Sequence, residues 1–203
     1  MITIVDYGMG NLGSVLNMFK KVGANAVVSS DIDEINKAEK ILLPGVGAFD
    51  TAMQKINQGA LREVLNYKAL TQKVPILGIC LGMQLLTNNS EEGTLPGLGW
   101  INAETKNFKD NISEDLKVPH MGWNIANICQ ETELTKGYEG EIRFYFVHSY
   151  YVKVQDEKNS MMKTSYGVTY DSAIVQDNIF GAQFHPEKSH RFGMNLFNNF
   201  NKI

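Results

Sequence analysis

The chain has 203 residues, of which 43% are hydrophobic and 20% are charged, and its formal net charge is −3. This composition is typical of a folded domain with a core of ordinary size, which needs neither disulfides nor a structural metal. The slightly negative charge and the lack of a Lys/Arg block argue against nucleic acid and anionic membranes as main partners.

Targeting and redox signals are few. No segment approaches a run of about 20 apolar residues, and the N-terminus lacks the basic and apolar regions of a signal peptide. The two cysteines, Cys80 and Cys129, do not indicate a disulfide framework. We therefore expect one cytoplasmic domain over residues 1–203, with reduced cysteines.

The first half of the chain alternates short apolar runs with helical periodicity. Short apolar strands that alternate with helices are typical of a parallel sheet covered on both faces. The pattern predicts strands at residues 2–5, 26–28, 41–43 and 74–79, and helices near 15–22, 49–58 and 60–70.

The second half has a different pattern. Residues 93–124 indicate loops and short strands, and consecutive strands without helices then indicate an antiparallel extension of the sheet. We predict an α/β fold with a mostly parallel central sheet, helices on both faces and this antiparallel extension. The later strands are expected at residues 142–147, 150–154, 161–165, 173–176 and 179–184, and a helix at about 189–200.

The turn from Gly8 to Gly13 fits the G-x-G-x-x-G pattern that binds the pyrophosphate of dinucleotides. However, Asp6 and Tyr7 stand between the strand and the first glycine, where phosphate would approach. The alternative is a tight strand-to-helix turn that needs glycine for positive φ. A dinucleotide-binding module is therefore one hypothesis for the function.

Cys80 lies in the run Gly-Ile-Cys-Leu-Gly, which has the form of a nucleophile elbow with Cys in place of Ser. Small residues two positions before and after the nucleophile allow a sharp turn from strand to helix. The side chain then projects at the carboxyl end of the sheet, and the N–H of Leu81 points to where an oxyanion would form. The alternative is an inert, buried thiol.

His185 is the candidate base among four histidines, because it follows a predicted strand and precedes Pro186 and Glu187. In an extended chain His185 and Glu187 point to the same side, so Glu187 can orient the imidazole toward Cys80. The alternative is a solvated His and Glu at a strand end. Neither Cys80 nor His185 has a second ligand at the usual zinc spacing, so no metal site is predicted.

The run Pro-Gly-Val-Gly at residues 44–47 ends another predicted strand, and we expect it at the same sheet edge as Cys80. Its two glycines allow the peptides to reorient and bring an N–H to a reacting carbonyl. The alternative is an ordinary turn.

Together these motifs resemble those of the class I (triad) glutamine amidotransferases. The runs around Cys80 and His185 resemble the nucleophile and His/Glu motifs of that family. Further runs resemble, in the same order, signatures of the HisH glutaminase subunits of imidazole glycerol phosphate synthase, and the similarity spans essentially the whole chain. These runs are residues 6–11, 44–47, 119–124, 146–151 and 185–189.

The resemblance implies an enzyme that hydrolyses L-glutamine to glutamate and ammonia without a cofactor. Cys80 would be the nucleophile, His185 the general base and acid, and Glu187 the residue that orients His185. The amides of Val46 and Leu81 would form the oxyanion hole. The residues implied to bind glutamine are Gly47, Gln84, Ser149 and Tyr150.

The resemblance also implies a partner. A HisF-type TIM-barrel subunit would receive the ammonia through a tunnel and form imidazole glycerol phosphate and AICAR in histidine biosynthesis. Asn11, Trp123 and Lys188 would face that subunit. Because residues 44–47 often reorient before the oxyanion hole is complete, we expect weak glutaminase activity without the partner.

Two alternatives concern the same chemistry. Residues 190–193, His-Arg-Phe-Gly, resemble HisH-like paralogues that supply ammonia to a synthase forming an amidino sugar of a surface polysaccharide. A stand-alone thiol hydrolase of the γ-glutamyl type is the other alternative, and it would be fully active without a partner.

Overall fold

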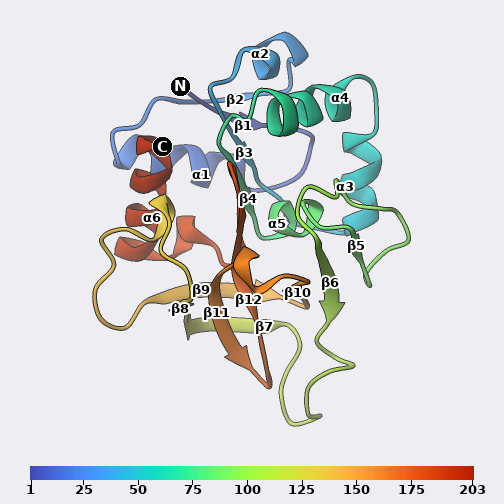
Figure 1. The fold of residues 1–203 in the computed structure, drawn as a ribbon, viewed down its shortest axis with the longest axis vertical. Helices are drawn as coiled ribbons and strands as arrows, with labels where there is room; N and C mark the ends of the chain where they lie inside the picture. The colour runs from blue at the N-terminus through green and yellow to red at the C-terminus, as the bar shows by residue number, and fades with distance from the viewer.

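A computed structural model describes residues 1–203 and shows an eleven-stranded sheet with helices packed around one half of it (Figure 1). The helices are α1 (Leu12–Lys21), α2 (Ile32–Lys37), α3 (Phe49–Ile56), α4 (Leu61–Asn66), α5 (Leu81–Leu85) and α6 (His190–Lys202). The strands are β1 (Ile2–Val5), β2 (Ala26–Ser29), β3 (Lys40–Leu43), β4 (Ile76–Ile79), β5 (Asn89–Ser90), β6 (Ala103–Asn107), β7 (His120–Ile125), β8 (Asn127–Ile128), β9 (Arg143–His148), β10 (Tyr150–Val154), β11 (Ser160–Tyr166), β12 (Val168–Gln176) and β13 (Ile179–Ala182).

Five neighbouring strands form the parallel part of the large sheet, in the order β2-β1-β3-β4-β13. β1, β4 and β13 are buried along their whole length, as expected for short apolar strands covered on both faces. The register of β4 on β13 places Ile79 opposite Ala182. The residues that follow these two strands, Cys80 and Gln183, therefore emerge side by side at the carboxyl edge.

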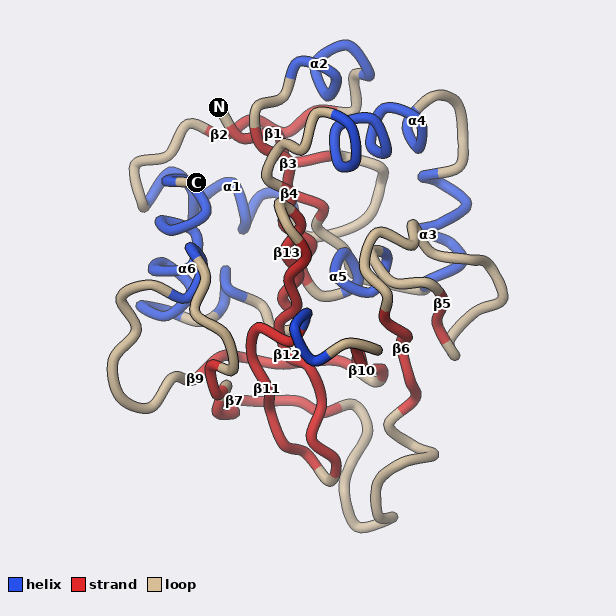
Figure 2. Tube along the Cα trace, viewed as in Figure 1, coloured by secondary structure: helices blue, strands red, loops and turns tan.

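The sheet continues through β12, β10 and β6, each antiparallel to its neighbour, and β11 pairs with both β12 and β8. β5 runs parallel to β6 at the far edge. β7 and β9 form a separate antiparallel ribbon in which His120 lies opposite His148. Figure 2 shows this ribbon running across the end of the large sheet near β12.

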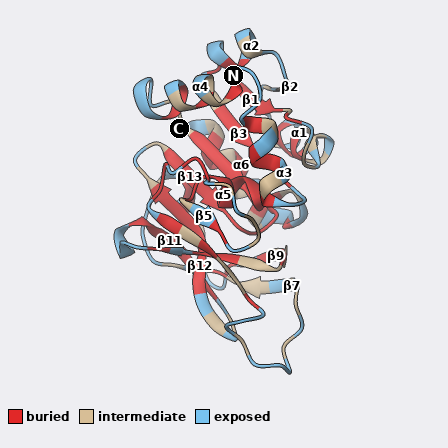
Figure 3. Ribbon diagram, turned by 90° about the vertical axis from the view of Figure 1, so that its right-hand side faces the viewer, coloured by how far each residue is buried: buried red, intermediate tan, exposed pale blue.

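Two layers of helices cover the parallel strands. Alternate residues of β1 point to opposite faces, so that Ile4 joins one core cluster and Val5 the other. α1 and α6 close the first face, where the rings of Phe19 and Phe197 meet edge-to-face with centroids 4.6 Å apart. α2, α3, α4 and α5 close the second face. Figure 3 shows the buried strands between these helices.

The predicted fold class is confirmed, with local differences. β12 begins at Val168, earlier than predicted, because its first half pairs with β11 in a hairpin. The helix predicted at 60–70 is α4 followed by a π-helical turn at Tyr67–Thr71. The β7–β9 ribbon was not predicted, since residues 120–125 lack apolar alternation. No helix in the structure has both the length and the hydropathy that a membrane span needs.

The turn from β4 into α5 requires a close approach of two backbones. A Cβ on Gly82 would overlap the carbonyl oxygen of Leu43 on β3, and a Cβ on Gly78 would overlap the carbonyl group of Gly82. Any larger residue at either position would push α5 away from the sheet. Glycine is therefore required at both positions of the predicted elbow, because no side chain fits there.

Replacing Gly82 by alanine should destabilise the protein, because the new methyl group would overlap the backbone of Leu43 within the sheet. We expect the free energy of unfolding in urea to fall by about 1–3 kcal/mol. Gly13→Ala in α1 is the matched control, because a Cβ there meets no atom within 4 Å and alanine favours the helix. If both variants lose the same free energy of unfolding, the close approach of Gly82 to the Leu43 backbone is contradicted.

Candidate active site

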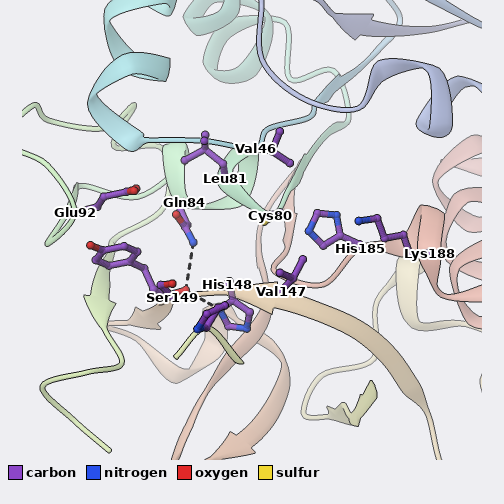
Figure 4. A pocket seen from close by; sticks show the side chains of 13 residues that line it. Val46, Cys80, Leu81, Gln84, Glu92, Val147, His148, Ser149, His185 and Lys188 are labelled. Carbon is purple, nitrogen blue, oxygen red and sulfur yellow. Dashed lines mark hydrogen bonds between the residues drawn. The ribbon is translucent and has the colours of Figure 1, made fainter. Parts of the chain in front are cut away.

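A cavity of about 350 Å³ opens at the carboxyl edge of β3 and β4, with walls from both halves of the chain (Figure 4). It brings together most of the residues that the sequence predicts for catalysis and glutamine binding. The lining residues are Val46, Gly47, Cys80, Leu81, Gln84, Glu92, Pro119, Val147, His148, Ser149, Tyr150, His185 and Lys188.

Cys80 occupies the turn between β4 and α5, with φ 54° and ψ −111°. A left-handed φ is uncommon for a residue other than glycine, and here the surrounding backbone holds it. The amide of Cys80 donates to the carbonyl of Ala182 at 2.7 Å. The side chain is only 8% exposed, yet it lines the cavity. The fold thus presents a largely buried thiol to a bound ligand.

His185 lies beside Cys80 on the cavity wall (Figure 4), and its Nδ1 is 2.8 Å from Oε1 of Glu187. The extended conformation predicted for this segment is wrong. Pro186–Lys188 form a 3₁₀ turn, which brings the Glu187 carboxylate back to the imidazole. The backbone is fixed as well, because the His185 amide donates to the Tyr145 carbonyl and the Ser189 hydroxyl donates to the His185 carbonyl.

The imidazole of His185 is strongly basic in this setting. Burial, the largest single influence, acts to lower its pKa, but hydrogen bonding to Cys80 and Glu187, with their negative charges adding to it, outweighs burial and raises the pKa to about 10. Nε2 of His185 is buried and has no hydrogen-bond partner within the chain. An oriented imidazole with a free nitrogen beside a thiol can accept the thiol proton and later return it.

The segment at residues 44–47 reaches the same cavity as Cys80, which Val46 and Gly47 help to line. The Val46 side chain is 48% exposed, and the Val46 amide makes no hydrogen bond within the chain. Gly47 has φ 113°, which glycine alone adopts readily. The amide of Leu81, at the first position of α5, has no intrahelical partner either. Two unpaired N–H donors are therefore available near Cys80.

Tyr7 anchors the start of the same segment. Its hydroxyl donates to the carbonyl of Pro44, and a Cβ on Gly45 would come within 2.9 Å of that hydroxyl. Burial, with the charge of Cys80 adding to it, raises the pKa of Tyr7 well above its ordinary value. Tyr7 therefore remains a neutral donor, and it fixes one end of the segment that carries Val46.

A chain of amide hydrogen bonds leads from the cavity wall to the sulfur. Gln84 donates from Nε2 to the Tyr150 carbonyl at 3.3 Å and to Oε1 of Gln183 at 3.0 Å. Gln183 donates from Nε2 to Sγ of Cys80 at 3.7 Å. Sequence reasoning missed Gln183, although the pairing of β13 with β4 would have revealed it, because the next residue after each strand must be a neighbour.

Glu92 is a second lining residue that the sequence did not reveal. Its Oε2 accepts from the amide of Phe49 at 3.0 Å. Burial, the largest influence, and the nearby Asp50 carboxylate raise the pKa of Glu92. No local motif marks Glu92, because the chain brings it to the cavity through the loop after β5. A half-buried carboxylate at this wall can bind an ammonium group.

Two histidines and a tyrosine form a buried cluster behind Ser149 and Tyr150. His120 Nδ1 lies 3.2 Å from His148 Nε2 and 3.1 Å from the Tyr170 hydroxyl. His148 Nδ1 lies 2.7 Å from the Tyr150 carbonyl, so Nδ1 carries the proton and Nε2 accepts. Burial lowers the pKa of His120 to about 4 and that of His148 to about 3. Both rings are therefore neutral near pH 7.

Of the three residues predicted to face a partner, Lys188 lines the cavity, whereas Trp123 and Asn11 do not. Trp123 on β7 is 46% exposed and stacks on His190, with ring centroids 5.5 Å apart. Lys188 lines the cavity, and its Nζ lies 5.7 Å from the centre of the Tyr145 ring. Asn11 caps the first turn of α1 with its side-chain oxygen.

Comparison with known proteins identifies the family. The family described as "Glutamine amidotransferase class-I" matches residues 3–203. The chain belongs to the class I glutamine amidotransferases. Its relatives include the "Imidazole glycerol phosphate synthase subunit HisH 2" of Methanococcus maripaludis, 52% identical over 202 residues, or 100% of this chain and 99% of the relative. The protein of the same name from Pseudomonas aeruginosa is 48% identical over 200 residues, or 98% of each chain.

Solved structures of glutamine amidotransferases share the fold. One crystal structure of a glutamine amidotransferase superposes with a TM-score of 0.76 at 14% identity, covering 100% of both chains. The glutaminase domain of Trypanosoma brucei CTPS, solved with bound acivicin, gives a TM-score of 0.68 at 16% identity over 99% of this chain and 90% of that one. At these identities the likeness concerns the fold alone.

In this glutamine amidotransferase, the glycine-rich turn contacts neighbouring residues of the same chain. The amide of Gly8 donates to the Asp6 carboxylate at 2.9 Å, and a Cβ on Gly10 would lie 3.1 Å from the Pro44 side chain. The turn thus lies against the start of the 44–47 segment. Family membership favours the glutaminase over the dinucleotide-binding hypothesis.

Mild acid should destabilise this glutamine amidotransferase through its buried histidines. In the folded protein His120 and His148 have pKa values of about 4 and about 3, against about 6.5 in an unfolded chain. The stability they contribute is present above about pH 6.5 and is lost as the pH falls, because the unfolded chain then binds up to two more protons. We expect the free energy of unfolding to fall by up to about 2.7 kcal/mol per pH unit between pH 6 and 5.

His185 does not cancel this effect. Its raised pKa contributes stability that is fully present below about pH 6.5 and is lost only as the pH rises toward about 10. His148→Asn should remove about half of the acid slope, whereas His190→Asn at the exposed surface should leave it unchanged. A flat profile for the wild-type protein between pH 6 and 5 would show that the two histidines are not held neutral.

Tyr7→Phe should loosen the 44–47 segment, because the buried Pro44 carbonyl loses its donor. We expect the free energy of unfolding to fall by about 1–2 kcal/mol and the glutaminase kcat to fall with it. Tyr67→Phe is the matched control, since Tyr67 is exposed and its hydroxyl makes no hydrogen bond, and its effect should stay within about 0.5 kcal/mol. If Tyr7→Phe and Tyr67→Phe have the same free energy of unfolding and the same kcat, Tyr7 does not hold the segment in place.

Proposed function

We propose that this chain is the glutaminase subunit of an imidazole glycerol phosphate synthase and hydrolyses L-glutamine through a thioester on Cys80. The observation that carries the proposal is the meeting of Cys80 with the His185–Glu187 pair at one cavity. Three relatives named HisH, from Methanococcus maripaludis, Pseudomonas aeruginosa and Bdellovibrio bacteriovorus, support it at 46–52% identity.

The first half of the reaction forms the thioester. The Cys80 proton moves to Nε2 of His185, and the thiolate attacks the side-chain amide carbon of glutamine. The negative charge that develops on the amide oxygen is met by the amides of Leu81 and Val46. His185 then gives its proton to the amide nitrogen, the C–N bond breaks, and ammonia leaves. Glu187 keeps Nδ1 of His185 protonated and the ring oriented throughout.

The second half returns the enzyme to its starting state. His185 takes a proton from water, and the hydroxide attacks the thioester carbon. When the C–S bond breaks, glutamate is released and the proton returns to the Cys80 sulfur. No cofactor or metal is needed, since every bond made and broken involves glutamine, water or these side chains.

Recognition of glutamine is assigned to the remaining walls of the cavity. The backbone at Ser149 and Tyr150 borders the substrate on one side and Gly47 on the other. Gln84 commits its amide nitrogen to Tyr150 and Gln183, which leaves its carbonyl oxygen for the substrate. Glu92 supplies the negative charge for the α-ammonium group of glutamine.

The partner is proposed to be a HisF-type TIM-barrel subunit that covers the cavity mouth and receives ammonia directly. Free ammonia in water is largely protonated and loses its nucleophilicity, so a covered path is chemically necessary. Trp123, Lys188 and Asn11 are assigned to this contact, and Met121 on β7 is also 62% exposed. A reducing cytoplasm suits this mechanism, because Cys80 must remain a free thiol.

The acceptor of the ammonia is set by the partner. The run at residues 190–193, which resembles paralogues that serve amidino-sugar synthases, begins with the His190 ring that stacks on Trp123. The departure from the HisH pattern therefore lies within the proposed docking face. Turnover with the cyclase substrate supports histidine synthesis, whereas turnover only with a sugar synthase would assign the alternative.

Cys80→Ala, assayed with the cognate synthase, should abolish glutamine-dependent turnover while turnover with added ammonium salts is kept. The reason is that only the release of ammonia from glutamine needs the thiol, whereas the synthase can take ammonia from solution. Cys129→Ala is the matched control, because Cys129 is exposed and does not line the cavity, and both activities should persist. Glutamine-dependent turnover by Cys80→Ala would refute the thioester mechanism.

A further inference from the structure

Gln183 provides the one side-chain hydrogen bond to the sulfur of Cys80, with Nε2 3.7 Å from Sγ. Its side chain is completely buried, with 0% exposure. We propose that Gln183 is a catalytic residue that donates a hydrogen bond to the Cys80 thiolate and stabilises it for attack on glutamine. This inference rests on the proposed thioester mechanism and adds a fourth residue to the reacting group.

The fold places Gln183 at the sulfur by strand register. β13 pairs with β4, and the amide of Cys80 donates to the Ala182 carbonyl at 2.7 Å, so the next residue must lie beside Cys80. The amide of Gln183 in turn donates to the Ser172 carbonyl on β12 at 2.9 Å. The backbone on both sides of Gln183 is therefore fixed, and its position does not depend on a mobile loop.

The orientation of the Gln183 amide group is also fixed. Gln84 donates from its own Nε2 to Oε1 of Gln183 at 3.0 Å, which leaves Nε2 of Gln183 to face the sulfur. A flipped Gln183 would set two donors against each other and point a carbonyl oxygen at a thiolate. Gln84 is held in turn by the Tyr150 carbonyl, which also accepts from His148. The donor is therefore oriented before substrate binds.

The chemistry requires such a donor because Cys80 is 8% exposed and has little help from water. When the proton leaves Sγ for Nε2 of His185, the sulfur gains a full negative charge in a buried place. Hydrogen bonds to ionised groups are stronger than those to neutral groups, so Gln183 favours the thiolate over the thiol. Gln183 keeps both of its own protons and contributes no net charge.

Gln183→Met tests this role, since methionine has nearly the same shape and no donor. The readout is the rate of alkylation of Cys80 by iodoacetamide across pH, in a Cys129→Ala background so that one thiol is followed. We expect the midpoint of the profile to rise by about one pH unit and alkylation at lower pH to slow about tenfold. The glutaminase kcat with partner should fall by about tenfold or more, with KM within about twofold.

Gln155→Met is the matched control, because Gln155 is exposed and its side chain makes no hydrogen bond, and both readouts should stay at wild-type values. Gln183→Glu, which places an acceptor against the sulfur, should raise the midpoint further than Gln183→Met. If Gln183→Met does not fold by circular dichroism, the same profile is measured on Gln183→Asn, whose shorter amide cannot reach the sulfur.

An unchanged alkylation midpoint in a folded Gln183→Met or Gln183→Asn variant would overturn the assignment. That failure is separate from failure of the proposed function. Retained glutamine-dependent turnover in Cys80→Ala would refute both the thioester mechanism and the role of Gln183. A reactive Cys80 with an unchanged alkylation midpoint in the Gln183 variants would refute the role of Gln183 alone.

Discussion

The backbone of Gly82 passes so close to the carbonyl of Leu43 that no side chain fits between them, and this contact determines where Cys80 lies. Because α5 must start directly at the end of β4, Cys80 alone makes the turn and adopts a φ of 54°. Such a conformation costs about 1–3 kcal/mol. Burial of Leu81 and Met83 against the sheet and the hydrogen bond to Ala182 offset that cost. The thiol is thereby aimed into the cavity without a flexible loop.

Both the parallel and the antiparallel half of the chain contribute walls to the cavity. The parallel strands deliver the thiol and the 44–47 segment, whereas β9 and β10 deliver Ser149 and Tyr150. The two halves are joined by hydrogen bonds through one carbonyl, that of Tyr150, which accepts from both Gln84 and His148. A buried polar group of this kind is costly unless satisfied, so the neutral state of His148 helps to keep the cavity in shape.

The sequence predicted the features that depend on short segments. The elbow at Cys80, the turn at 44–47 and the contact of His185 with Glu187 depend on residues within a few positions of each other, and local steric rules were sufficient. Even there, the extended conformation predicted between His185 and Glu187 was wrong. Pro186 starts a 3₁₀ turn, which the two-residue periodicity of a strand does not predict. Glu92 and the β7–β9 ribbon depend on contacts between distant segments, which apolar periodicity does not encode.

Gln183 lies between these two cases. It sits in the run that carries His185, but its partner is known only once β13 is seen to pair with β4. The strands themselves were predicted, and their order in the sheet was not. A sequence argument that also assigned strand order would have set Gln183 beside Cys80, because register is strict in a sheet buried on both faces.

The distribution of exposure explains why a partner could control such a site. Cys80 and His185 are buried and fixed by backbone hydrogen bonds, whereas Val46 is 48% exposed between two glycines. Tyr7 holds only the Pro44 end of that segment. The peptide that carries the Val46 amide can therefore rotate without moving Cys80 or His185. In the proposed complex, a subunit that docks at the cavity mouth would need to bias only this one peptide to complete the proposed oxyanion hole, and the thiol would stay shielded from water.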